Sequence, residues 1–209
     1  MNSEPANPPR AKKRHARARR LNELFAKTEK HSGGESWYKL DTSAIIMPSV
    51  TRGNYNLVFR IAAMLDEDVH LPRLSQAMER LVPRFPYFMV DLRAGFFWHY
   101  LQPLVDCIPA PVADSVYPCV GFNPLRHNRT MFRVRAFRNR IAVEFSHILT
   151  DGKGALEYLR ALLTEYFRLG GIDIPDDGTI MRVDQSPHPE ESEDAYNRHF
   201  IFGAPPADG

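Results

Sequence analysis

The feature that most constrains this chain is the turn FSHILTDG, residues 145–152, because it joins an apolar strand directly to an amphipathic helix. Residues 141–146 (IAVEFS) are short, apolar and rich in branched or aromatic side chains, which is typical of a strand. Residues 154–169 (GALEYLRALLTEYFRL) repeat apolar side chains at helical spacing, and Gly170-Gly171 follows as a stop signal. A turn between a strand and a helix lies at a sheet edge beside a helix N-terminus, which is a usual place for a ligand.

Three residues of this turn are candidates for chemistry: His147, Asp151 and Gly152. A neutral imidazole at His147 can take a proton near neutral pH, since the unperturbed pKa is ~6.5. Asp151 can cap the helix donors or pair with an arginine and brace the loop. Gly152 and Gly154 allow a sharp turn and close approach of a ligand. The alternative is a purely structural turn; a metal site would need a third ligand besides His147 and Asp151.

The rest of the chain predicts a two-layer sandwich. The predicted strands cover residues 37–47, 55–65, 87–93, 96–101, 131–138 and 141–146, and the predicted helices cover residues 16–30, 71–82 and 154–169. Residues 55–65 are predicted as a buried strand and residues 131–138 as a half-exposed one, with a turn at Asn139-Arg140. This order is not a regular βαβ alternation, so we expect an α/β fold with a mixed sheet and flanking helices.

The charge distribution predicts three segments. Residues 1–20 carry seven Lys and Arg and one Glu, whereas the other 189 residues carry 20 Lys and Arg against 24 Asp and Glu. We expect residues 1–20 to be a basic disordered tail, residues 21–172 to be the folded lobe, and residues 173–209, with nine Asp and Glu and five prolines, to be an acidic linker or tail. The basic tail leaves nucleic-acid or anionic-lipid binding open as an alternative, although the body has no RNA-binding aromatic signature.

Composition also predicts a cytoplasmic protein. The sequence has no run of ~20 apolar residues that could span a membrane. The basic, Pro-rich N-terminus has no apolar stretch behind it, which is unlike a secretory signal. Only two cysteines occur, Cys107 and Cys119, and their spacing fits neither a metal site nor a disulfide framework.

The segment HILTDG (147–152) has the H-x-x-x-D-G pattern of the chloramphenicol acetyltransferase and condensation-domain superfamily, which the chain resembles over residues 37–200. Residues 81–103 and 133–171 look most like bacterial alcohol acetyltransferase-like proteins, and residues 184–200 look like the linker between their lobes. This resemblance implies a chloramphenicol acetyltransferase-like fold. It implies acyl-CoA or an acyl-carrier thioester as co-substrate, a small alcohol or amine as acceptor, and no bound cofactor or metal.

The resemblance also implies residue roles. His147 matches the general base, Asp151 matches a largely architectural aspartate that pairs with an arginine, and Gly152 matches the glycine that keeps the substrate tunnel open. Ser146 stands where many condensation domains have a first histidine. The candidate partners of Asp151 are Arg133, Arg135 and Arg138.

The length of the chain departs from this family pattern. Family members that carry the motif early in the chain have two similar lobes with the active site between them, and this sequence reaches only the first. We therefore expect an N-terminal lobe that needs a second lobe, a partner subunit or a second copy of itself. The alternative is a catalytically inactive lobe that acts as a binding module or is a non-functional remnant.

Overall fold

A computed structural model of the chain describes residues 38–39, 57–94, 99–104, 107–122, 129–175, 177–188 and 191. Its strands are β1 (Tyr38–Lys39), β2 (Val58–Met64), β3 (Val90–Ala94), β4 (His99–Pro103), β5 (Val112–Ala113), β6 (Phe132–Phe137) and β7 (Arg140–Ser146). Its helices are α3 (Leu71–Leu81), the 3-10 helix η2 (Pro86–Phe88) and α4 (Gly152–Leu169). The predicted helix 16–30, the basic tail and most of the predicted strand 37–47 lie outside the described residues. None of the described helices is long and apolar enough to cross a membrane.

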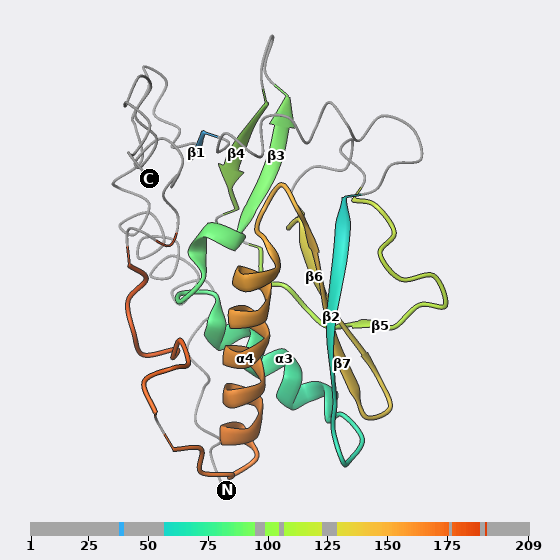
Figure 1. The fold of residues 1–209 in the computed structure, drawn as a ribbon, viewed down its shortest axis with the longest axis vertical. Helices are drawn as coiled ribbons and strands as arrows, with labels where there is room; N and C mark the ends of the chain where they lie inside the picture. The colour runs from blue at the N-terminus through green and yellow to red at the C-terminus, as the bar shows by residue number, and fades with distance from the viewer. Residues whose placement is uncertain are drawn as a thin grey trace, which may run out of the picture.

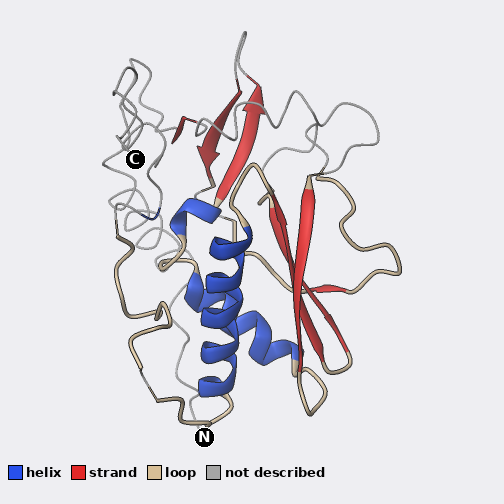
Figure 2. Ribbon diagram, in the orientation of Figure 1, coloured by secondary structure: helices blue, strands red, loops and turns tan. Residues whose placement is uncertain are grey.

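The chain folds into an α/β arrangement with two sheets. The larger sheet has the strand order β2-β7-β6-β5, in which β5 runs parallel to β6 and the other pairs are antiparallel. The smaller sheet has the order β1-β4-β3 and is antiparallel. Both α3 and α4 lie on the same side of the larger sheet (Figures 1 and 2). The predicted α/β sandwich with a mixed sheet and flanking helices is therefore confirmed.

Alternation of side chains along β6 and β7 separates the two faces of the larger sheet. Phe132, Val134 and Ala136 of β6 are buried in the core beneath the helices. Arg133 and Arg135 lie on the opposite face, as the predicted half-exposed strand requires. Phe137 pairs with Arg140, so the two residues of the hairpin turn are Arg138 and Asn139. The turn predicted at Asn139-Arg140 was therefore wrong by one residue.

Two strand predictions needed correction. The strand predicted over residues 55–65 was expected to be buried, but β2 is an edge strand with mostly half-buried side chains, because β7 is its sole neighbour among the described strands. The first residues of the strand predicted over residues 87–93 belong instead to the 3-10 helix η2, and the observed strand β3 begins at Val90. Pro86 occupies the first turn of η2, where its missing N–H is tolerated.

The helices follow the predicted ranges closely. α3 ends one residue before its predicted end, and α4 begins two residues earlier than predicted. The buried stripe of α4 runs through Ala155, Tyr158, Leu159, Leu162 and Tyr166. Leu156 belongs to the helically spaced apolar residues of 154–169 that predict a core-facing stripe, but it is 44% exposed, and Leu71 of α3 is likewise exposed. Both leucines lie near the start of their helices, beside the regular i, i+3, i+4 stripe that packs on the sheet.

The core contains a cluster of aromatic rings around Tyr158 of α4. The ring centroids of Phe85, Phe88, Phe132 and Phe145 lie 5.2–5.8 Å from that of Tyr158, all in edge-on arrangements. Such arrangements stabilise aromatic pairs beyond their buried area. The Tyr158 hydroxyl has no hydrogen-bond partner among the described residues, and burial raises its pKa well above the usual value for tyrosine.

Substituting Tyr158 with Phe is expected to leave the free energy of unfolding unchanged or to raise it by about 1 kcal/mol, because a buried hydroxyl without a partner carries a desolvation penalty. The matched control is Tyr166→Phe. The Tyr166 hydroxyl accepts a hydrogen bond from the His70 backbone N–H at 2.9 Å, so its removal should lower stability by about 1 kcal/mol. Urea unfolding of both variants measures the difference, and a clear loss of stability in Tyr158→Phe would show that the hydroxyl is satisfied.

Part of the segment predicted as an acidic linker packs on the lobe. Met181 and Val183 contact the core, and Glu191 forms a bidentate ion pair with Arg84 at 2.6 and 2.9 Å. Glu191 also accepts a hydrogen bond from the Tyr87 hydroxyl at 2.8 Å. The side chain of Arg84 is only 3% exposed, so this pair ties the segment to the end of the helix layer. The domain boundary at residue 172 stays a prediction, since most of residues 189–209 lie outside the described ranges.

Candidate functional site

The turn after β7 is held by backbone hydrogen bonds at both sides. The Ser146 N–H donates to the Met131 carbonyl at 2.9 Å, and the His147 N–H donates to the Leu57 carbonyl at 2.7 Å. The second bond continues the pairing of β7 with β2 by one residue beyond Ser146. Within the turn, the Leu149 N–H donates to the Ser146 carbonyl at 2.9 Å. The backbone of His147 is therefore fixed by β2 rather than left to an isolated loop.

Side-chain burial alternates at the start of the turn. Ser146 is buried, and its hydroxyl accepts a hydrogen bond from the Ile148 N–H at 3.3 Å. Ile148 is also buried, in a small cluster with Val90 of the smaller sheet and Met131. His147 lies between these two anchored residues and is exposed. Ser146 and Ile148 therefore fix the turn on both sides of His147, and the imidazole between them remains accessible to solvent.

The imidazole of His147 contacts one aromatic side chain among the residues that the structure describes. Its ring centroid lies 4.3 Å from that of Phe59 on β2, with an angle of 34° between the planes. Neither ring nitrogen forms a hydrogen bond or an ion pair with another described residue. A neutral imidazole in this setting keeps a nitrogen available to accept a proton from an incoming group.

Asp151 caps the N-terminus of α4. Its carboxylate accepts a hydrogen bond from the Gly154 N–H at 2.8 Å, and its carbonyl accepts the first helical bond, from the Ala155 N–H, at 3.1 Å. This satisfies donors that a helix end otherwise leaves unpaired. Of the two roles that the sequence left open for Asp151, the described structure shows the capping role.

The expected ion pair between Asp151 and Arg133, Arg135 or Arg138 is not formed. Arg133 and Arg135 lie on the face of the sheet away from the helices and bind a different carboxylate, that of Glu144. The guanidinium of Arg138 lies over the ring of Phe137, 5.5 Å from its centroid. The prediction failed because the period-two alternation of β6 turns Arg133 and Arg135 away from the helix that Asp151 caps.

Replacing Asp151 by Ala is expected to lower the free energy of unfolding by about 0.5–2 kcal/mol, through loss of the cap. Asp151→Asn retains a carbonyl oxygen that can accept the same hydrogen bond, so it should recover most of the loss. Chemical denaturation of the three proteins measures both effects. Equal losses in the Ala and Asn variants would indicate that the charge of Asp151, rather than the cap, is what matters.

The two glycines of the turn face different surroundings. A side chain at Gly154 would clash with the hydroxyl of Thr150, so the fold itself favours glycine there. A Cβ at Gly152 would meet nothing within 4 Å, and the residue is exposed at the first position of α4. No described residue therefore explains a glycine at position 152, and its role beside a substrate tunnel stays a prediction.

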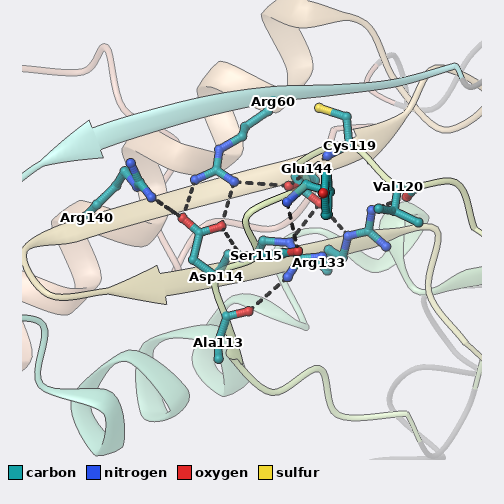
Figure 3. A network of polar contacts seen from close by, with 11 residues as sticks. Arg60, Ala113, Asp114, Ser115, Cys119, Val120, Arg133, Arg140 and Glu144 are labelled. Atoms are coloured by element: carbon teal, nitrogen blue, oxygen red, sulfur yellow. Dashed lines mark hydrogen bonds and ion pairs between the residues drawn. The ribbon is translucent and has the colours of Figure 1, made fainter.

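The opposite face of the larger sheet carries an arginine–carboxylate network (Figure 3). Glu144 lies in the middle of β7 and pairs across the sheet with Arg60 on one side and Arg133 on the other. Its carboxylate, which is 0% exposed, binds Arg60 at 3.2 Å, Arg133 at 2.5 Å and Arg135 at 2.9 Å. Burial alone would raise the pKa of Glu144, but the hydrogen bonds from Arg133 and Arg135 outweigh burial, and its pKa lies below the usual value.

The same network holds the segment 112–122 against the sheet. Asp114 binds Arg60 at 2.7 Å and Arg140 at 2.6 Å, and the hydrogen bonds from Arg60 hold its pKa well below its usual range. The Cys119 N–H donates to Glu144 at 3.2 Å, and Arg133 donates to the Val120 carbonyl. This network is structural: its guanidinium groups are engaged with this segment, on the face of the sheet away from the helices.

Sequence reasoning missed three residues around the site. Phe59 and the carbonyl of Leu57 reach His147 only because β2 pairs with β7, which is a contact far apart in the chain. The buried hydroxyl of Ser146 accepts a hydrogen bond from the Ile148 N–H, and the sequence does signal this role, because serine is a recognised turn-forming residue. Within the described ranges, no group of three or more His, Cys, Asp or Glu side chains could hold a metal ion.

Comparison with known proteins gives similar folds but no sequence family. No family model and no curated protein matches the chain. Among solved structures, the X-domain from teicoplanin biosynthesis matches with a TM-score of 0.54 and 14% identity, over 70% of this chain and 35% of that chain. The starter condensation domain of rhizomide synthetase RzmA matches with a TM-score of 0.52 and 13% identity, over 68% of this chain and 40% of the other.

A third similar structure is the SgcC5 protein from Streptomyces globisporus, with a TM-score of 0.52 and 14% identity, over 65% of this chain and 38% of that chain. At these identities the likeness shows the fold, which is that of condensation domains and related proteins. The chain spans less than half the length of each of these three structures.

Proposed function

We propose that this chain is the N-terminal part of an acyl-thioester-dependent acyltransferase with His147 as its general base. The observation that carries the proposal is the accessible imidazole of His147, placed where β7 meets α4, with neither ring nitrogen bonded to another described residue. The HILTDG motif and the condensation-domain fold support it.

The reaction follows from what a neutral imidazole can do. A nitrogen of His147 takes the proton from the hydroxyl or amine of the acceptor, and the freed oxygen or nitrogen attacks the thioester carbonyl carbon. The carbon–sulfur bond then breaks, and the leaving thiolate takes the proton from the imidazolium. The products are the acylated acceptor and a free thiol, and no acyl group is transferred to the protein.

The donor and the completing partner are inferred from chemistry and from chain length. An acyl-CoA or a carrier-bound acyl thioester supplies the activated carbonyl, and a small alcohol or amine is the acceptor. Likeness to a starter condensation domain of a synthetase favours a carrier-bound donor, whereas the resemblance to alcohol acetyltransferase-like proteins favours acyl-CoA. Because the chain covers only 35–40% of the similar structures, we infer that a second lobe or a partner subunit completes the site. The protein that contains this site is proposed to be cytoplasmic.

A second candidate function is a binding module without catalysis. The observation that favours it is the short span of the chain relative to the similar structures, since one lobe alone provides one wall of an interlobe site. The coding sequence directly downstream discriminates between the two candidates: a second lobe encoded there favours the enzyme.

The experiment that tests the enzyme is a thiol-release assay. The purified chain is incubated with acetyl-CoA or a longer acyl-CoA and a panel of small alcohols and amines, alone and together with any downstream-encoded lobe. We expect thiol release that depends on the acceptor and equals the amount of acylated product. Intact-protein mass spectrometry should show no acylated protein. A folded protein that releases no thiol with any acceptor, with or without the second lobe, would contradict the proposal.

A further inference from the structure

The ring of Phe59 is the described aromatic side chain that lies against the imidazole of His147. The two ring centroids are 4.3 Å apart, at an angle of 34° between the planes. The backbone of His147 is fixed by its hydrogen bond to the Leu57 carbonyl. That bond leaves rotation of the side chain free, so the orientation of the imidazole depends on what its ring touches.

Phe59 is itself held in place. It pairs with Phe145 across β2 and β7, and their ring centroids lie 6.4 Å apart in a stacked arrangement. Its ring packs against the core on the helix side of the sheet. A side chain buried on one side by the core and presented on the other to His147 forms a rigid surface rather than a mobile neighbour.

A general base is commonly oriented by a third group that bonds to it, often a carboxylate. In this chain the carboxylate of the motif, Asp151, is used to cap α4. We propose that Phe59 is the positioning residue for His147: it orients the imidazole by ring contact and leaves both nitrogens for proton transfer. This inference rests on the proposed function of His147.

The proposal predicts a kinetic effect of Phe59→Leu. Leucine keeps an apolar side chain in the core but lacks the flat face, so the imidazole is no longer held in one orientation. We expect kcat to fall by about 10- to 100-fold with KM changed less than twofold, because small displacements of a catalytic group carry losses of that size. Phe59→Tyr keeps the ring and should restore kcat to within a few-fold of the wild type.

The matched control is Phe167→Leu, the same change at a half-buried ring of α4 that packs on the same core and contacts Tyr166. It should lower stability to a similar extent and leave kcat unchanged. Equal kcat values for Phe59→Leu and Phe167→Leu would overturn the positioning role. Loss of kcat in Phe59→Leu without recovery in Phe59→Tyr would overturn it as well.

A spectroscopic measurement tests the ring contact independently of activity. The carbon-bound imidazole protons of His147, assigned by NMR through their loss in His147→Ala, should resonate upfield of those of free histidine, because they lie over an aromatic ring. The upfield shift should disappear in Phe59→Leu and persist in Phe59→Tyr and Phe167→Leu. Its absence in the wild type overturns the inference while the acyltransferase proposal stands. An inactive protein with the shift present contradicts the acyltransferase and leaves the ring contact supported.

Discussion

His147→Ala is expected to lower the rate of acyl transfer by about 10²–10⁴-fold, which is the range for loss of a general base. The imidazole is accessible at the turn between β7 and α4, and no other described side chain bonds to its nitrogens. Because the side chain is exposed, its removal should change the free energy of unfolding by about 0.5 kcal/mol or less. The loss would therefore appear in kcat rather than in the amount of folded protein.

The control for this measurement is His99→Ala, the same substitution at another exposed histidine, on β4 of the smaller sheet. It should retain the wild-type rate. Rates are compared in the thiol-release assay with the acceptor that gives the most product, and folding is checked by circular dichroism. Equal rates for His147→Ala and the wild type would remove His147 from the mechanism, whatever the donor.

Glu144→Gln is expected to lower the free energy of unfolding by about 3–5 kcal/mol, the range for removing one partner of a buried ion pair. Glu144 is 0% exposed, and the side chains of Arg60, Arg133 and Arg135 around it are 11–19% exposed. The glutamine has nearly the same shape but leaves three guanidinium groups without their shared negative charge. The same change should loosen the segment 112–122, because the Cys119 N–H also donates to Glu144.

The dependence of this effect on pH has a definite sign. The pKa of Glu144 is lowered in the folded protein, so its contribution to stability is present above the unfolded pKa of ~4.3 and is lost as the pH falls through the folded pKa. The wild type and Glu144→Gln should therefore differ most near neutral pH and converge under acid conditions, as the pH falls below the folded pKa of Glu144.

Urea unfolding at a series of pH values measures this convergence. The control is Asp184→Asn, which removes a carboxylate that is 65% exposed and pairs with Arg182, and it should change stability by less than about 1 kcal/mol. A Glu144→Gln variant as stable as this control at neutral pH would show that the network does not depend on the charge.

The sequence by itself determined the elements whose signals are local. The apolar periodicity of α3 and α4, the alternation of β6 and the capping role open to Asp151 are properties of neighbouring residues. The pairing of Arg133 with Glu144 was also within reach, since a two-residue turn at Arg138 and Asn139 sets the register between β6 and β7. The predicted turn was wrong by one residue. An error of one residue in the register between two paired strands moves every side chain of a strand to the other face of the sheet.

Tertiary structure alone decided what surrounds the imidazole. Phe59 and Leu57 meet His147 through the pairing of β2 with β7, and the 87 residues that lie between Phe59 and His147 contain no local pattern that predicts this contact. The same pairing brings Arg60 to Glu144, on the face of the sheet where the arginines of β6 also bind this carboxylate. Hydrophobic periodicity specifies which face of a strand is buried but not which distant strand becomes its neighbour, and the choice of neighbour decided which residues surround His147.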